Sequence, residues 1–165
     1  MAAPVITVEK NDTGTTVASW DAGTVQANND SDIFTIVIWN NKGNTTSAVS
    51  DLKDASITTL DMDGGTSSDV VAGKWVQINV PAIDGTDTTV ATNWSAIGGA
   101  TMKYIRADGL PASAGSVIRG TTNDGNKATT NTKVNYCTVN LKAHVPLNAT
   151  PGTKVWKTRL NGYYV

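Results

Sequence analysis

Hydrophobic and polar residues alternate along two stretches of the chain, which is the pattern of a strand with one face in a core. In the clearest stretch, residues 135–145, the odd-numbered positions after Asn135 are apolar and the even-numbered ones mostly polar. Residues 74–80 alternate in the same way, and Pro81 ends that strand because proline has no N–H to donate. Residues 33–40 are apolar on both faces, which predicts a central strand.

A final strand is expected over 153–165, with a bulge near Asn161-Gly162, where glycine permits an irregular backbone. Weaker patterns predict further short strands at 5–9, 15–20, 47–52, 56–60, 70–71, 102–106 and 116–119. No stretch shows the spacing of an amphipathic helix, and Asp-Gly turns recur between the apolar runs. These patterns predict an all-β chain, folded as a sandwich or a small barrel.

The length of 165 residues is enough for one compact domain, so we expect a single β-domain over residues 1–165. Residues 108–133 hold few large apolar groups besides Val117 and Ile118, and are rich in Gly, Ser, Thr and Asn. A connection of that length in a compact domain is typical of a functional or mobile loop. We therefore expect a long surface excursion over 108–133.

The composition excludes several classes of partner. The formal net charge is −1 and the basic residues are spread thinly, which argues against nucleic acid and against a charged membrane surface. No apolar run is long enough to span a bilayer, and the first residues lack the pattern of a secretory signal. With Cys137 as the single cysteine, no internal disulfide can form, which is typical of a protein made in reducing cytoplasm.

Candidate catalytic residues are few. His144 is the only histidine and lies on the polar face of its strand, whereas Cys137 lies on the apolar face. Side chains on opposite faces of a sheet cannot form a Cys–His pair, so Cys137 is interpreted as a core residue. Most of the aspartates stand beside Gly, Ser or Asn in predicted turns, and turn chemistry accounts for them without a pair of catalytic carboxylates. We therefore expect no enzyme activity and no cofactor.

Two aspartate clusters have the alternating oxygen ligands that calcium prefers, at 61–65 and at 30–32. Neither cluster continues to the glutamate that closes an EF-hand loop, since Glu9 is the only glutamate of the chain. Similar clusters are common in β-hairpins. The sequence therefore predicts no metal site. A chelator that lowers the melting temperature would support calcium binding by one of these clusters.

The large aromatic residues are more informative. By the alternation of their strands, Trp39, Trp75 and Tyr136 point away from the most apolar faces, while Trp20 and Trp156 are expected in the core. Aromatic groups on an outer face stack on sugars or anchor a protein interface. The alternative is that long loops fold over these three residues and cover them. The sequence leaves both possibilities open.

Five blocks of the chain stand out: FTIVIWNNKG at 34–43, VSD at 49–51, ITT at 57–59, DGG at 63–65 and GKWV at 73–76. These blocks resemble virion proteins of tailed bacteriophages, in particular proteins of the capsid-decoration type with an immunoglobulin-like β-sandwich. The ending, VPLNATPG at 145–152 followed by Trp156, Arg159-Leu160 and Tyr163-Tyr164, is similar to the last hairpin of such modules. The resemblance covers about two thirds of the chain and leaves 108–133 unmatched.

The resemblance implies an immunoglobulin-like antiparallel β-sandwich with long loops and no catalytic residues. It also implies a structural protein, made in the host cytoplasm, that decorates and stabilises the capsid exterior in the virion. Its partners would be the major capsid protein, copies of itself, or both. A tail or baseplate position is a variant, and a carbohydrate-binding module that recognises host-surface glycans is the alternative.

We expect the contact with the particle on three regions: residues 1–9, residues 108–133, and the strand that carries Trp75. Extended ends and long loops pair readily with exposed sheet edges of a neighbour. Five interface candidates follow from these regions and from the outer aromatics: Trp39, Trp75, Tyr136, Val5 and Ile118.

Overall fold

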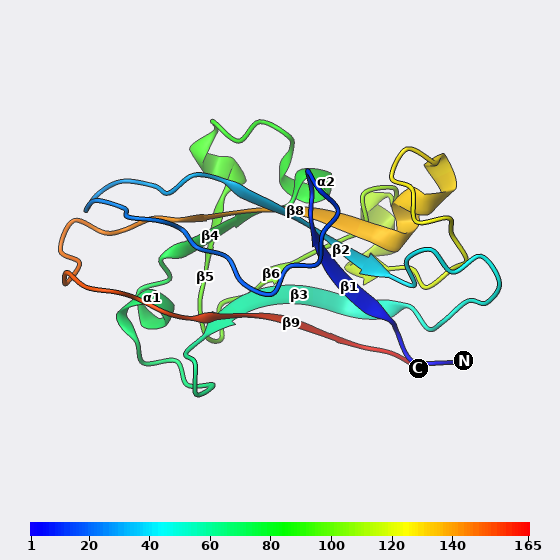
Figure 1. Ribbon diagram of the computed structural model, residues 1–165, viewed down its shortest axis with the longest axis horizontal. Coiled ribbons are helices and arrows are strands. Elements are labelled where there is room, and N and C mark those ends of the chain that lie inside the picture. The colour runs from blue at the N-terminus through cyan, green and yellow to red at the C-terminus, as the bar shows by residue number, and fades with distance from the viewer.

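A computed structural model describes all 165 residues, and its larger sheet has five antiparallel strands (Figure 1). Their order across the sheet is β1 (Ile6–Lys10), β2 (Phe34–Asn40), β8 (Tyr136–Ala143), β4 (Val76–Asn79) and β5 (Ser95–Ile97). The central pair is in a register that sets Ile36 opposite Val139 and Ile38 opposite Cys137. The strands expected at 5–9, 33–40, 74–80 and 135–145 are thereby confirmed, while β5 was not predicted.

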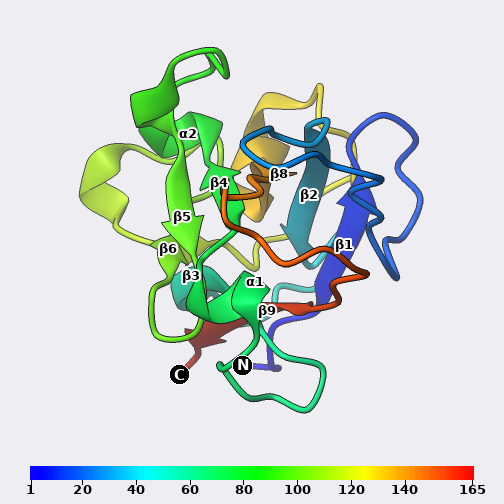
Figure 2. The same ribbon diagram turned by 90° about the vertical axis from the view of Figure 1, so that its left-hand side faces the viewer.

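The second sheet is built on one long strand, β3 (Leu52–Leu60). On one side β3 pairs with the short strands β6 (Lys103–Tyr104) and β7 (Val117–Ile118), and on the other side with β9 (Lys157–Tyr163). Figure 2 shows the five strands of the first sheet side by side, with β3 and β9 in a layer below them. The two sheets therefore form an all-β antiparallel sandwich, as expected.

The strand order has the logic of an immunoglobulin sandwich. In such domains one sheet has the order A-B-E-D, and C pairs with F in the other sheet. Here β1, β2, β8 and β4 stand in the A-B-E-D order, while β3 and β9 pair as C and F do. The strands β5, β6 and β7 are insertions between D and E.

The core lies between the sheets and consists mainly of Ile, Val and Leu side chains from alternate strand positions. Trp20, predicted in the core, is half-buried and packs against the core. Its ring stacks on Phe34 at 5.7 Å between centroids and meets Trp156 edge-on at 5.6 Å. Because Phe34 begins β2 and Trp156 precedes β9, Trp20 bridges the two sheets.

Two weakly predicted strands are wrong. Residues 70–71 lie in a short helix, α1 (Asp69–Ala72), because the Ser68 hydroxyl accepts a hydrogen bond from the Val71 amide and caps the turn. Residues 15–20 form no strand and contribute only a bridge between Thr16 and Glu9. The other helical turns are α2 (Pro81–Asp84), η1 (Ala91–Asn93), η2 (Ala112–Ala114) and η3 (Thr130–Asn135). No helix has the length and hydropathy needed to cross a membrane.

Of the two strands expected at 47–52 and 56–60, the second lies within β3, which has a bulge, whereas the first is wrong because only Leu52 of that range belongs to a strand. The register with β9 shifts between Lys53 and Ser56, and Asp54 in between has a positive φ of 49°. The extra residue of the irregularity is therefore on β3, opposite Gly162 of the Asn161-Gly162 pair at which a bulge was predicted. Gly162 instead permits close packing, since a Cβ there would lie 2.6 Å from Leu52 Cδ1.

Residues 108–133 are not a surface excursion throughout. Ile118 is fully buried against the core, and Asn123 and Thr132 are buried as well. The side-chain amide of Asn123 donates to the backbone carbonyl of Asn41 at 2.8 Å, which connects this segment to the end of β2. The segment is thus an integral part of the fold, and polar contacts replace the large apolar groups that it lacks.

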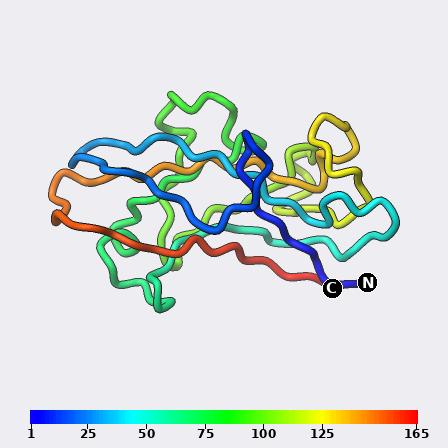
Figure 3. Tube along the Cα trace, in the orientation of Figure 1, coloured from blue at the N-terminus to red at the C-terminus, as the bar shows by residue number.

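Both ends of the chain lie side by side at one end of the sandwich (Figure 3). Ser50 holds both of them. Its amide donates to the Ala2 carbonyl at 2.8 Å, and its hydroxyl donates to the Val165 carbonyl at 3.2 Å. Residues from the two ends therefore share one surface.

Candidate interaction surfaces

The outer face of the first sheet carries a covered aromatic pair. Trp39 and Tyr136 lie 4.6 Å apart between ring centroids and are only 1% and 5% exposed. Lys42 covers Trp39, with its Nζ 5.4 Å from the ring centroid and 2.5 Å from Glu9 Oε1. The Tyr136 hydroxyl donates to the carbonyl of Lys127 at 3.3 Å. The sequence left open whether the outer aromatic residues are exposed or covered, and in the structure Trp39 and Tyr136 are covered.

Asp108 attaches the loop segment to this face. Its carboxylate accepts hydrogen bonds from the Thr138 amide at 2.8 Å and from the Thr138 hydroxyl at 2.6 Å. Burial raises the pKa of Asp108 above its ordinary value, although these bonds and the charges of Lys127 and Lys133 act in the opposite direction. Burial, together with the charge of Asp108, also raises the pKa of Tyr136. These contacts close the outer face of β8.

Two more of the predicted interface residues are inside the molecule. Trp75 is 8% exposed and belongs to the core cluster, and Ile118 is 0% exposed. Trp75 precedes β4, so the alternation of that strand does not set its direction. Of the five candidates only Val5, at 54%, is exposed in the isolated chain. Trp39, Trp75, Tyr136 and Ile118 stabilise the fold and present no free surface.

The outer face of the second sheet has exposed aromatic groups instead. Tyr104 on β6 is 53% exposed and Tyr163 on β9 is 49% exposed, with Met102 beside them. Lys157 and Arg159, also on β9, are exposed and make no ion pair, because the six ion pairs of the chain involve other residues. This face therefore combines exposed aromatic groups with free positive charge.

Sequence reasoning did not single out these residues as contacts, although one signal was present. Lys157, Arg159 and Tyr163 are odd-numbered residues of one strand, and such residues share a face. Applying the same alternation to 153–165 would have predicted a basic and aromatic outer face. The pairing of Tyr104 with Ser56 on β3 brings the second tyrosine to that sheet.

A second exposed apolar group lies where the ends of the chain meet. Val5 at the beginning of β1, and Tyr164 and Val165 after β9, are all more than half exposed. Because Ser50 holds both ends, these side chains lie on the same end of the sandwich. The terminal surface is defined here as Met1, Val5, Tyr164 and Val165.

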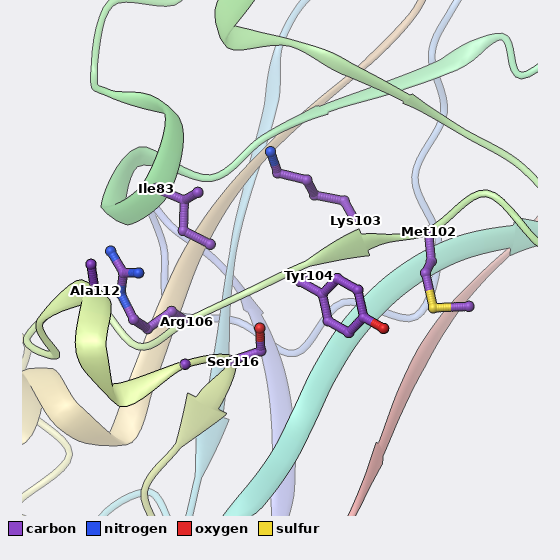
Figure 4. A pocket seen from close by; sticks show the side chains of 8 residues that line it. Ile83, Met102, Lys103, Tyr104, Arg106, Ala112 and Ser116 are labelled. Carbon is purple, nitrogen blue, oxygen red and sulfur yellow. The ribbon is translucent and has the colours of Figure 1, made fainter.

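A shallow hollow of about 400 Å³ lies beside β6 (Figure 4). Figure 4 shows Arg106 next to Ala112 and Ile83, and the Lys103 side chain pointing away from the Tyr104 ring. Lys103 is paired with Asp84 at 2.5 Å, and the Arg106 guanidinium donates to the Ala82 carbonyl. The charged groups of the hollow are therefore engaged in internal contacts.

The single histidine is part of a surface ion cluster. Asp30 contacts His144 Nδ1 and Lys142 Nζ, each at 2.6 Å. Burial alone would raise the pKa of Asp30. The hydrogen bonds from Lys142 and His144 together outweigh burial and keep this pKa below its ordinary value. Cys137 is fully buried on the opposite face, as predicted, and burial raises its pKa well above the usual range.

The aspartate clusters considered for calcium bond to their own loops. Asp61 accepts hydrogen bonds from Ser67 and Ser68, and Asp63 accepts one from the Gly65 amide at 2.8 Å. The bond from Ser68 keeps the pKa of Asp61 low. No group of three His, Cys, Asp or Glu side chains is arranged to hold a metal ion.

No protein-family model matches the chain, and no curated protein is significantly similar to it in sequence.

Proposed function

We propose that the chain is a non-enzymatic structural protein of a tailed-bacteriophage particle that decorates and stabilises the capsid exterior. The observation that carries this proposal is the group of exposed side chains on the outer face of the second sheet, Tyr104, Tyr163 and Met102. Tyrosine is a frequent anchor of protein interfaces. A broad, ordered face of this kind suits a contact repeated over a lattice of identical sites.

The partners would be the major capsid protein and neighbouring copies of this chain. A stable contact buries about 800 Å² on each partner. The isolated chain has 8580 Å² of accessible surface, so such a contact would use about a tenth of it. The outer face of the second sheet and the terminal surface both offer exposed apolar groups for this purpose.

Mass spectrometry of purified particles from the source of this chain tests the proposal. We expect the chain in mature virions, and its absence there would overturn the proposal. An electron-microscopy map of the same particles locates the chain and separates a capsid position from a tail or baseplate position.

Matched variants test the face itself. The double variant Tyr104→Ser and Tyr163→Ser removes both exposed rings of the second sheet. Leu147→Ser is the control, because Leu147 is 78% exposed in a turn distant in sequence from both strands. We expect the double variant to lose occupancy on the particle by at least about tenfold and the control to keep it. Equal occupancy for both variants would contradict the use of this face.

The carbohydrate-binding alternative depended on outer aromatic residues that are free to stack on a sugar. Trp39, Trp75 and Tyr136 are buried, which favours the virion role over glycan binding through these residues. A glycan array reports directly on the alternative, and specific binding that survives the double tyrosine variant would speak against the virion proposal.

A further inference from the structure

The strand β9 has a long free edge. It pairs only with β3, and its seven residues make no backbone hydrogen bond outside that ladder. In an immunoglobulin sandwich the strand called G lies beside F, at the place next to β9. An unpaired row of N–H and C=O groups is a template for another strand.

The ladder pattern identifies the residues whose backbone groups point outward. The Ile105 amide donates to the Ala55 carbonyl at 2.8 Å, so Ala55 turns its carbonyl toward β6. Backbone direction alternates along a strand, so Ser56 and Thr58 turn theirs toward β9, where their partners are Asn161 and Arg159. The backbone N–H and C=O groups that point away from β3, toward the free edge, are therefore those of Thr158, Leu160 and Gly162.

The other sheet edges are covered or short. The Val17 amide donates to the Val8 carbonyl and the Lys10 amide to the Thr15 carbonyl, both at 2.9 Å, so residues 15–17 cover β1. The edge strand β5 has three residues, and β6 and β7 have two each. The edge of β9 is thus the one place where a full-length strand can add to this sandwich.

Charge indicates what such a strand would carry. Residues 151–165 contain Lys154, Lys157 and Arg159 and no acidic residue. Only Lys154 is neutralised, by Asp69 at 2.8 Å, and Lys53 on the neighbouring strand is also without an ion pair. Acidic side chains on the outer face of an incoming strand would therefore meet free positive charge.

The inner face of the same strand would meet apolar groups. Val17, Trp20 and Leu160 are only partly buried and pack against the core. Alternate residues of an added strand point to opposite faces. A segment with alternating acidic and apolar residues therefore matches both faces of the edge.

We infer that the free edge of β9 binds an extended, acidic segment of a partner protein by strand addition. The row of backbone donors and acceptors favours a peptide over a nucleic acid, which has no matching ladder. This inference goes beyond the proposed function, because it concerns the chemistry of the edge and holds for a partner inside or outside a particle.

A synthetic peptide tests the inference with the intact chain. The probe is a nine-residue peptide of alternating glutamate and valine with blocked ends, and its control replaces every glutamate by lysine. We expect titration calorimetry to detect binding of the glutamate peptide that weakens as salt is added, and at least about tenfold weaker binding of the lysine peptide. Hydrogen exchange should slow at the amides of Thr158, Leu160 and Gly162.

Two variants separate the backbone from the charge. Thr158→Pro removes one outward N–H and leaves the ladder with β3 intact, because proline is tolerated on an edge strand whose N–H faces solvent. Lys157→Glu with Arg159→Glu reverses the charge, and Lys74→Glu with Lys133→Glu is the control with the same net change at exposed, unpaired lysines. We expect each edge variant to bind the glutamate peptide about tenfold more weakly, and the control variant to bind it with unchanged affinity.

Four results would overturn the inference: no peptide binding, equal binding of the two peptides, peptide binding without protection of the β9 amides, or equal loss in edge and control variants. Analytical ultracentrifugation of the chain alone adds a fifth. A dimer that Thr158→Pro dissolves would assign the edge to a second copy and not to an acidic partner. All five leave the presence of the chain in virions unaffected, so failure here is distinct from failure of the proposed function.

Discussion

The outer faces of the two sheets differ in how far their aromatic side chains are exposed. On the first sheet the aromatic pair Trp39 and Tyr136 is covered by Lys42 and by the segment that Asp108 anchors. On the second sheet Tyr104 and Tyr163 are about half exposed, and the edge of β9 is bare. The same residue type therefore stabilises the fold on one side and remains available for contacts on the other.

The difference arises from where the long connections run. Residues 108–133 pass from β6 to β8 and pack against the end of β2 through Asn123 and Asn41. On the second sheet, residues 99–102 cover Ser56 and Thr58 of β3, but Tyr104 and Tyr163 remain about half exposed. A surface that loops leave open in an otherwise well-covered domain is the natural place for a partner. The contrast between the two faces can be tested by substitution.

The largest effect is expected for Trp39→Ala. Removing a fully buried aromatic side chain costs about 3–5 kcal/mol of unfolding free energy. Tyr163→Ala should change stability by less than about 1 kcal/mol, because the ring is half exposed. Denaturant unfolding of both variants measures the difference, and equal losses would show that the two faces are not distinct.

A conservative variant sharpens this result. The Trp39 Nε1 atom is buried without a hydrogen-bond partner, which is unfavourable for a donor. Trp39→Phe removes that donor and keeps most of the ring, so we expect a loss of less than about 2 kcal/mol. A cost as large as that of alanine would indicate that the indole N–H has a partner, such as an ordered water.

An intermediate effect is expected at Gly162. A Cβ at this position would lie 2.6 Å from Leu52 Cδ1 and 3.0 Å from the Lys53 carbonyl oxygen. Gly162→Ala should therefore destabilise the chain by about 1–3 kcal/mol, because the β3–β9 ladder must shift. Gly23→Ser is the control with open space around it, although its positive φ adds some strain of its own. A neutral Gly162→Ala would mean that the edge strand is free to move.

Alternation along the chain predicted the strands that form the core. Residues 135–145 and 33–40 became the central pair β8 and β2, and Cys137 and His144 lie on opposite faces as expected. The pattern works there because one face of each strand is buried between the sheets, and burial acts on every second residue. The class of the fold follows from these strands.

The pattern failed where long-range contacts decide. Trp39 and Tyr136 point outward as predicted, but alternation says nothing of the loop that covers them. Ile118 is buried although its surroundings in sequence are polar, because amide side chains satisfy backbone groups of that segment. The Asn123 side chain, for example, donates to the Thr121 carbonyl and accepts from the Gly125 N–H. The Ser68 cap overrides the strand preference of Val70-Val71. The open face of the second sheet emerges only from the pairing of β3 with β6 and β9.

The smallest effect concerns the anchor of the covering segment, Asp108. Burial raises the pKa of Asp108 in the folded state above the ordinary value of 3.8, which the unfolded state keeps. At pH values between the unfolded-state pKa and the folded-state pKa, the folded state therefore binds more protons than the unfolded state. Stability therefore falls as the pH rises through that window. Asp108→Asn keeps an acceptor for the Thr138 amide and cannot ionise. We expect the variant to gain stability relative to the wild type with rising pH, by less than about 1 kcal/mol.

Asp87→Asn is the matched control, with the opposite sign. The hydroxyl and the amide of Thr89 both donate to the Asp87 carboxylate, and these bonds lower its pKa. Its contribution to stability is present above the ordinary pKa and is lost as the pH falls, so Asp87→Asn should lose stability relative to the wild type with rising pH. Unfolding of the three proteins between about pH 3 and pH 7 gives both slopes. Slopes of the same sign would mean that Asp108 is hydrated, and that its segment covers the first sheet less completely than the geometry indicates.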